Sequence, residues 1–92
     1  MSESEAMTRD TANKVYDILV EDCGAKEFWR EGFIQYVTDG GEMKAWRFGG
    51  SLGDKFYIDA WRVRCYREDD TPERTAAIAR ANKRLRELKE SQ

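Results

Sequence analysis

Residues 46–67 read WRFGGSLGDKFYIDAWRVRCYR, and this stretch decides the fold because it combines aromatic and β-branched residues with a glycine cluster. Aromatic and β-branched side chains are enriched in strands, and glycines between such runs favour turns. All the aromatic residues except Tyr16 lie between Phe28 and Tyr66. We therefore expect a small antiparallel sheet in the middle of the chain, built around these residues.

Three strands are expected in this region. The first is 33–38, and the Asp39-Gly40-Gly41 segment that follows is a strong hairpin signal between runs of β-forming residues. The second strand is 42–48, and 49–53 forms the next turn. The third strand begins near Lys55 and continues to about Tyr66.

The alternation of the third strand changes phase near Asp59-Ala60. Phe56 and Ile58 share one face, and three later residues share the other: Trp61, Val63 and Cys65. A bulge or a tight turn at 59–60 would repair this mismatch. The segment is therefore one bulged strand or two short strands with a corner, which leaves the sheet with three or four strands.

Two helices flank the sheet. The first helix is expected from about Thr8 to Asp22, with Thr8 as the N-cap and Gly24 as the terminator. Apolar residues at helical spacing form its buried face, which ends just after it: Ala12, Val15, Tyr16, Leu19 and Cys23. One further helical turn is allowed near 26–30. Thr71 followed by Pro72 marks the start of a second helix. Its apolar stripe is Ile78, Ala81, Leu85 and Leu88.

These elements predict one α+β domain of the order α-βββ-α, with the helices packed on one face of the sheet. The domain spans 8–89, with a disordered tail over 1–7 and a frayed tail over 90–92. The chain of 92 residues is long enough for only one such domain.

Charge and cysteine content limit the possible classes of protein. The pI near 5.2 argues against strong non-specific binding to duplex nucleic acid, although 71–92 is basic. Cys23 and Cys65 are too few for a disulfide framework, so reduced thiols in the cytoplasm are expected. No stretch is long and apolar enough for a membrane helix, and the acidic N-terminus does not resemble a signal peptide.

Catalysis is not expected. The chain contains no histidine, which removes the commonest general base and metal ligand. The glycine-rich segment 49–55 fails the phosphate-loop pattern, because Gly53 and Lys55 are not adjacent and a strand follows. We predict no enzyme activity, no cofactor and no metal site.

The candidate functional surface is a group of arginine and aromatic side chains on one sheet face. If Trp61, Val63 and Cys65 point into the core, alternation sends the residues between them outward. With Trp46 or Arg47 from a neighbouring strand, the predicted contact residues are Trp46, Arg47, Arg62, Arg64, Tyr66 and Arg67. Arginine, tryptophan and tyrosine dominate protein-binding hot spots.

Other interpretations of this surface stay open. It is also consistent with a solvated sheet face, with a single-stranded RNA or DNA-binding site that stacks bases on aromatic rings, or with the interface of a homodimer. The cationic residues of the last helix are Arg80, Lys83, Arg84 and Lys89. Three interpretations of these residues stay open, namely a solvated helix face, a docking surface for an acidic partner, and pairing with the acidic residues of 17–31.

Three strings of the chain resemble a set of small uncharacterised proteins of phages and mobile elements. They are GSLG at 50–53, KFY at 55–57 and CYREDDTPER at 65–74, and the helix at 12–20 is similar to the same pattern. Relatives have a longer glycine-rich loop after Gly53. The resemblance implies an anti-defence setting, in which small acidic proteins of the anti-CRISPR kind inhibit a host protein or nucleoprotein complex by covering its surface.

Overall fold

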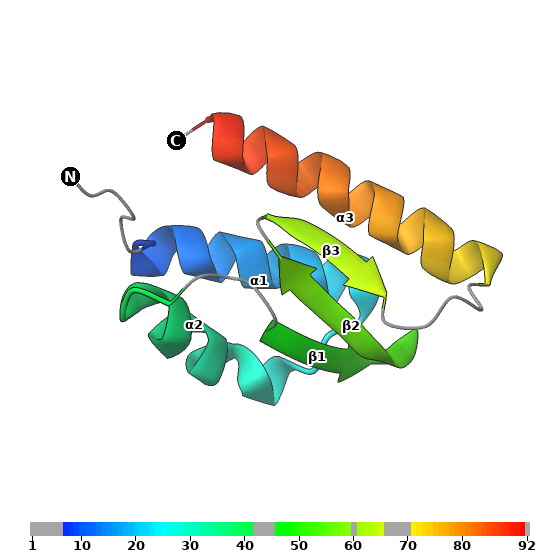
Figure 1. Cartoon of the computed structure of the whole chain (residues 1–92), viewed down its shortest axis with the longest axis horizontal. Helices are drawn as coiled ribbons and strands as arrows, with labels where there is room; N and C mark the ends of the chain where they lie inside the picture. The colour runs from blue at the N-terminus through cyan, green and yellow to red at the C-terminus, as the bar shows by residue number, and fades with distance from the viewer. Residues whose placement is uncertain (1–6, 42–45, 60, 66–70, 92) are drawn as a thin grey trace.

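The computed structural model describes residues 7–41, 46–59, 61–65 and 71–91, and they form an α+β domain as predicted (Figure 1). The helices are α1 (Arg9–Cys23), the 3₁₀ turn η1 (Glu27–Trp29), α2 (Arg30–Thr38) and α3 (Pro72–Glu90). The strands are β1 (Trp46–Gly50), β2 (Gly53–Asp59) and β3 (Arg62–Cys65). Of the predicted terminal tails, residues 1–6 and 92 lie outside the described residues.

α1 begins and ends, and α3 begins, where their capping residues predict, while α3 extends to Glu90 into the predicted frayed tail. The Thr8 hydroxyl accepts a hydrogen bond from the Thr11 amide, and Gly24 ends α1 in the left-handed conformation with φ of 71°. The Thr71 hydroxyl accepts from the Arg74 amide, with Pro72 in the first turn of α3. The apolar face of α1 is buried as expected.

The predicted strand at 33–38 is wrong, because these residues belong to α2. Phe33, Ile34 and Val37 are buried at a spacing that a helix, and not a strand, places on one face. The Asp39-Gly40-Gly41 segment ends this helix instead of forming a hairpin. The Gly41 amide donates to the Tyr36 carbonyl at 3.0 Å and Gly40 has φ of 91°, as in a Schellman C-terminus.

The sheet contains three antiparallel strands in the order β1-β2-β3, and it is formed by two successive hairpins. The predicted second strand, 42–48, corresponds to β1 from Trp46 onward, and its residues 42–45 lie outside the described residues. The predicted third strand is two strands, and the change of phase arises because the chain reverses between Asp59 and Arg62. Phe56, Ile58 and Val63 therefore all face the core.

The end of β1 is attached to the end of α1. The Ser51 amide donates to the Gly24 carbonyl at 3.1 Å, and the Lys26 amide donates to the Gly49 carbonyl at 3.3 Å. A Cβ atom on Gly50 would lie 1.7 Å from the Gly24 carbonyl oxygen, so only glycine fits this crossing.

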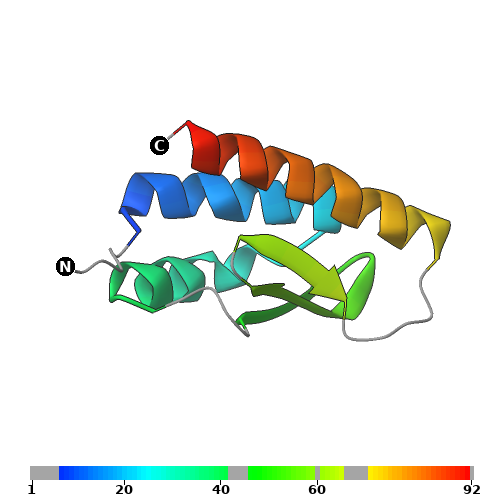
Figure 2. The same ribbon diagram turned by 45° about the horizontal axis from the view of Figure 1, so that its top comes forward.

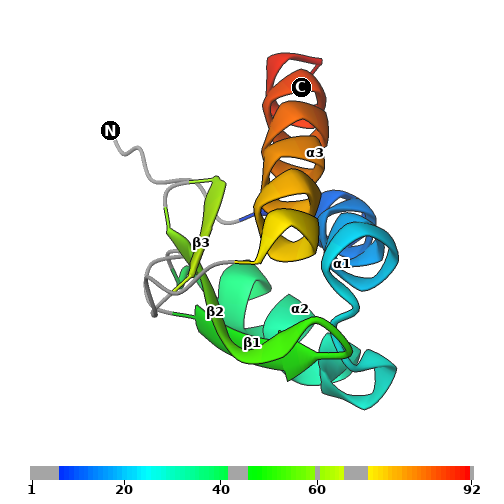
Figure 3. The same cartoon turned by 90° about the vertical axis from the view of Figure 1, so that its right-hand side faces the viewer.

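The core lies between the inner face of the sheet and the helices. α1 and α3 lie side by side, and in the view of Figure 2 α2 and the sheet lie below this pair. α3 also packs against β3. The helices lie on one side of the sheet, and within the described part of the chain no helix covers its other face (Figure 3). This open side is called the outer face below.

Candidate interaction surface

The outer face carries a row of charged and aromatic residues that crosses all three strands. Arg47 of β1 lies opposite Tyr57 of β2, which lies opposite Arg64 of β3. Directly opposite residues of an antiparallel pair have Cβ atoms about 4.5–5.5 Å apart, so the three side chains form one contiguous row. Arg47 and Arg64 are exposed and Tyr57 is half-buried.

A second cross-strand pair continues this face. Asp59 of β2 lies opposite Arg62 of β3. The outer face thus gathers three arginines, one aspartate and one tyrosine, and its charge is positive although the whole chain has a net charge of −2. A surface of this kind is complementary to carboxylates, which arginine can bind through two parallel hydrogen bonds.

The six residues predicted as the contact surface have different positions. Arg47, Arg62 and Arg64 share the outer face, whereas Tyr66 and Arg67 lie outside the described residues. Trp46 does not share that face, because it alternates with Arg47 and packs on the core side. Its ring centroid lies 5.4 Å from that of Phe33 and 5.4 Å from that of Tyr36. Trp46 is therefore a packing residue of β1.

Two residues of this surface were not predicted. Alternation around Phe56 and Ile58 already indicates that Tyr57 and Asp59 point the other way. Their position next to Arg64 and Arg62 depends on the register of β2 with β3, which is known only once the chain is seen to reverse after Asp59.

Two exposed aromatic side chains lie elsewhere, on η1. The side chain of Phe28 is 76% exposed and that of Trp29 is 45% exposed, with their ring centroids 5.7 Å apart. The Lys26 ammonium lies 6.0 Å from the Phe28 ring. The sequence allowed one further helical turn near 26–30, and η1 is that turn. Phe28 and Trp29 belong to a different element from the strands that carry the Arg47–Tyr57–Arg64 row.

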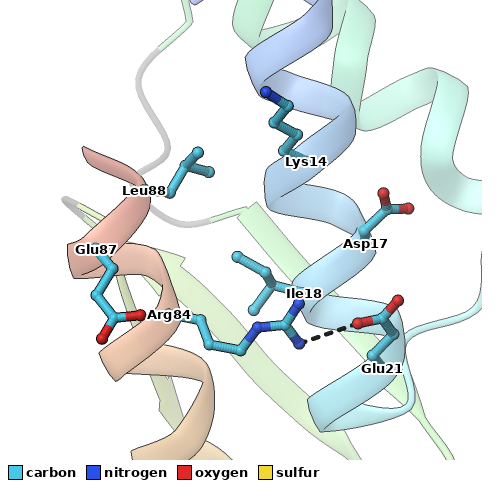
Figure 4. A pocket seen from close by; sticks show the side chains of 7 residues that line it. All are labelled: Lys14, Asp17, Ile18, Glu21, Arg84, Glu87 and Leu88. Atoms are coloured by element: carbon cyan, nitrogen blue, oxygen red, sulfur yellow. Dashed lines mark hydrogen bonds and ion pairs between the residues drawn. The ribbon is translucent and has the colours of Figure 1, made fainter. Parts of the chain in front are cut away.

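The groove between α1 and α3 is a mixed-charge surface whose arginine is already paired. It has a volume of about 390 Å³ and is lined by Lys14, Asp17, Ile18, Glu21, Arg84, Glu87 and Leu88 (Figure 4). Arg84 Nη1 lies 3.0 Å from Glu21 Oε1 and 3.3 Å from Asp22 Oδ2. The basic α3 thus pairs with the acidic α1 within the chain, which was one of the alternatives open from sequence.

The cysteines are packing residues where the structure describes them. Cys23 is buried and Cys65 is half-buried, and both are free. Burial, followed by the charge of Asp22, raises the pKa of the Cys23 thiol to about 12. The thiol is therefore protonated at neutral pH, which makes it a poor nucleophile.

Among the described residues no group of three or more Cys, Asp or Glu side chains is placed to hold a metal ion. No helix in the described ranges is long and apolar enough to cross a membrane.

Comparison with known proteins finds no match to a protein-family model, to a curated protein or to a solved structure. The resemblance to phage and mobile-element proteins thus stays a prediction from sequence.

Proposed function

We propose that this protein is a non-catalytic interaction protein that covers an acidic surface of a partner protein with the outer face of its sheet. The observation that carries the proposal is the Arg47–Tyr57–Arg64 row on a face that no described helix covers. Arginine supplies forked donors for carboxylates, and tyrosine supplies contact area at a low entropic cost.

The packing of the inner side of the sheet favours binding by the outer face without a conformational change. The strands that carry the row are fixed from behind by the buried side chains of Phe48, Phe56 and Val63. A rigid surface loses little conformational entropy on association, so more of the contact energy contributes to affinity.

The sheet edges favour binding through the face and not through an added strand. The Asn82 side chain hydrogen bonds the Val63 amide and carbonyl on the free edge of β3. On the opposite edge, Lys26 donates to Gly49 near the end of β1. Strand addition requires free backbone groups along an edge, and these two contacts occupy several of them.

The partner that we propose is a host defence complex of bacteria, inhibited by surface occlusion in the anti-CRISPR manner. This part rests on the sequence resemblance to phage and mobile-element proteins and on the positive face of an otherwise acidic chain. Surfaces that bind partners through arginine and aromatic residues commonly concentrate their affinity in a few such side chains.

The test is a pull-down from bacterial lysate, with and without nuclease treatment, using three forms of the tagged protein. They are the wild type, an Arg47→Glu/Arg64→Glu variant of the outer face, and an Arg80→Glu/Lys83→Glu control with the same charge change on exposed positions of α3. We expect the wild type and the control to retain one stoichiometric protein that the outer-face variant loses.

Two results would contradict the proposal. One is retention of the same protein by a folded outer-face variant. The other is recovery of RNA or DNA alone, with all protein partners lost after nuclease and with affinity falling steeply as salt rises. That second result would support the single-stranded nucleic-acid alternative, because release of counterions makes phosphate contacts salt-dependent.

A further inference from the structure

A second cavity opens where β3 meets α3. It has a volume of about 340 Å³ and is lined by Trp61, Arg62, Asn82, Arg86 and Lys89, which we call the cationic pocket. Its three α3 residues are spaced by four and three positions, so they share one face of the helix. Figures 1 and 3 show α3 running alongside β3.

The walls of the cationic pocket are held together by Asn82. Its Oδ1 accepts from the Val63 amide at 2.6 Å, and its Nδ2 donates to the Val63 carbonyl at 3.2 Å. These two hydrogen bonds hold α3 against Val63 of β3, the neighbour of Arg62 in the chain. The pocket therefore has a defined geometry between two secondary-structure elements.

The charge of the cationic pocket is not compensated by its lining. Arg62, Arg86 and Lys89 all line it, and no carboxylate does. Within the described ranges none of the three forms a salt bridge, whereas Arg30 pairs with Asp17 and Arg84 pairs with Glu21. Three cations around one cavity repel each other, and a bound anion would remove that repulsion.

One wall of the cationic pocket is formed by Trp61, in the turn between β2 and β3. Its φ of 67° is the positive value that a two-residue reversal between Asp59 and Arg62 favours. Trp61 is half-buried, packs partly against the core, and borders the cavity.

We propose that the cationic pocket binds a nucleotide, with the phosphates between Arg62, Arg86 and Lys89 and the base against Trp61. Three cations match the charge of a diphosphate better than that of a single carboxylate. The indole offers a flat surface on which any base can stack. The volume lies in the range of about 300–1,000 Å³ that is typical of small-molecule sites.

The experiment is an NMR titration of the ¹⁵N-labelled protein with ADP, inorganic pyrophosphate and adenosine. We expect ADP to shift the indole N–H signal of Trp61 and to bind more tightly than either fragment, because it alone contacts both the cations and the ring. A single-stranded oligonucleotide is added as a fourth probe. It shows whether the same pocket prefers a free nucleotide or one within a strand.

Matched variants locate the site. Arg86→Ala/Lys89→Ala should weaken ADP binding by about tenfold or more, because two charge-assisted contacts are lost. Arg80→Ala/Lys83→Ala removes the same charge from α3 outside the pocket and should leave the affinity unchanged. All four positions are exposed, and a well-dispersed spectrum confirms that each variant is folded.

Three outcomes would overturn the proposal. They are an unmoved Trp61 signal at millimolar ADP, equal affinity for ADP and pyrophosphate, and equal weakening by the two double variants. Arg62 belongs to both the outer face and the cationic pocket, but the variants distinguish the two proposals, since Arg47 and Arg64 do not line the pocket and Arg86 and Lys89 are not on the sheet.

Discussion

Asn82 of α3 hydrogen bonds both backbone polar groups of Val63 in β3, with its Oδ1 2.6 Å from the amide nitrogen and its Nδ2 3.2 Å from the carbonyl oxygen. One side chain thereby replaces the neighbouring strand that the edge of β3 lacks. It also joins the last helix to the sheet.

Asn82→Ala is expected to lower the free energy of unfolding by about 1–3 kcal/mol, because a partly buried amide and carbonyl lose their partners. Chemical denaturation measures this change. Hydrogen exchange at the Val63 amide should accelerate at the same time. Lys83→Ala, one position along α3 and exposed, is the control and should have little effect. Equal stability of the two variants would contradict the prediction.

Gly50→Ala is expected to prevent the native crossing of α1 and β1. The new methyl group would lie 1.7 Å from the Gly24 carbonyl oxygen, and backbone atoms there cannot move aside cheaply. We expect a loss of about 3–5 kcal/mol or failure to fold, measured by circular dichroism during denaturation. Native stability of this variant would mean that the two segments do not approach this closely.

Gly32→Ala, in contrast to Gly50→Ala, is expected to raise the free energy of unfolding. Gly32 lies in α2, and an added Cβ would make only an ordinary contact at 3.7 Å with the Trp46 ring. Alanine has a higher helix propensity, so the variant should gain about 0.5 kcal/mol. The same denaturation measurement checks it. A loss of stability would argue against a helix at 30–38.

Arg30→Ala is expected to destabilise the junction of α1 and α2. The Arg30 guanidinium lies 2.8 Å from Asp17 Oδ1 and 3.1 Å from Asn13 Oδ1, bonds Glu27, and stacks 5.2 Å from the Tyr16 ring centroid. Its side chain is only 19% exposed. We expect a loss of about 1–3 kcal/mol in denaturation, only partly restored by Arg30→Lys, because lysine lacks the planar fork.

Stability should fall in alkaline solution. Burial is the main cause that raises the pKa of Tyr16 from 10.0 to about 12 and that of Cys23 from 9.0 to about 12. The folded state therefore retains protons that the unfolded chain releases. The stabilisation is complete below about pH 9 and is lost as the pH rises toward 12.

The free energy of unfolding as a function of pH measures this effect. Tyr16→Phe and Cys23→Ala each remove one of the two titrating groups, so each variant should have a flatter profile above pH 9. A wild-type slope in both variants would assign the alkaline loss to other groups.

The helices at the ends of the chain were predictable because capping residues act locally. The N-caps Thr8 and Thr71 accept a hydrogen bond from a backbone amide three residues later, and Gly24 ends α1 in a left-handed conformation. These signals lie within a few residues, so no distant contact is needed to recognise them. The α+β class follows from these helices and the aromatic centre of the chain.

The strand predicted at 33–38 was wrong because β propensity and helical spacing conflict there. Ile34 and Val37 favour strands by shape, but burial at 33, 34 and 37 follows a helix, and tertiary packing outweighs propensity. The short segment allows either period, and the Asp-Gly pair is compatible with both a hairpin and a helix terminus.

The outer face was only partly predictable, because alternation acts within one strand whereas neighbours on other elements depend on the tertiary fold. Alternation alone identified Arg62 and Arg64 as neighbours on one face. Placing Arg47 and Tyr57 beside them needed the strand register. Bringing Arg86 and Lys89 to Arg62 needed the packing of α3 on β3, which no local pattern encodes.

The crossing of Gly24 and Gly50 has a consequence for dividing the chain. The Gly24 carbonyl and the Lys26 amide bond to Ser51 and Gly49, which lie in the other half of the sequence. Two peptides, 1–41 and 46–92, should each fail to form a stable structure alone. Mixed together, they should reassemble into a native-like complex, which would make the protein a candidate for fragment complementation.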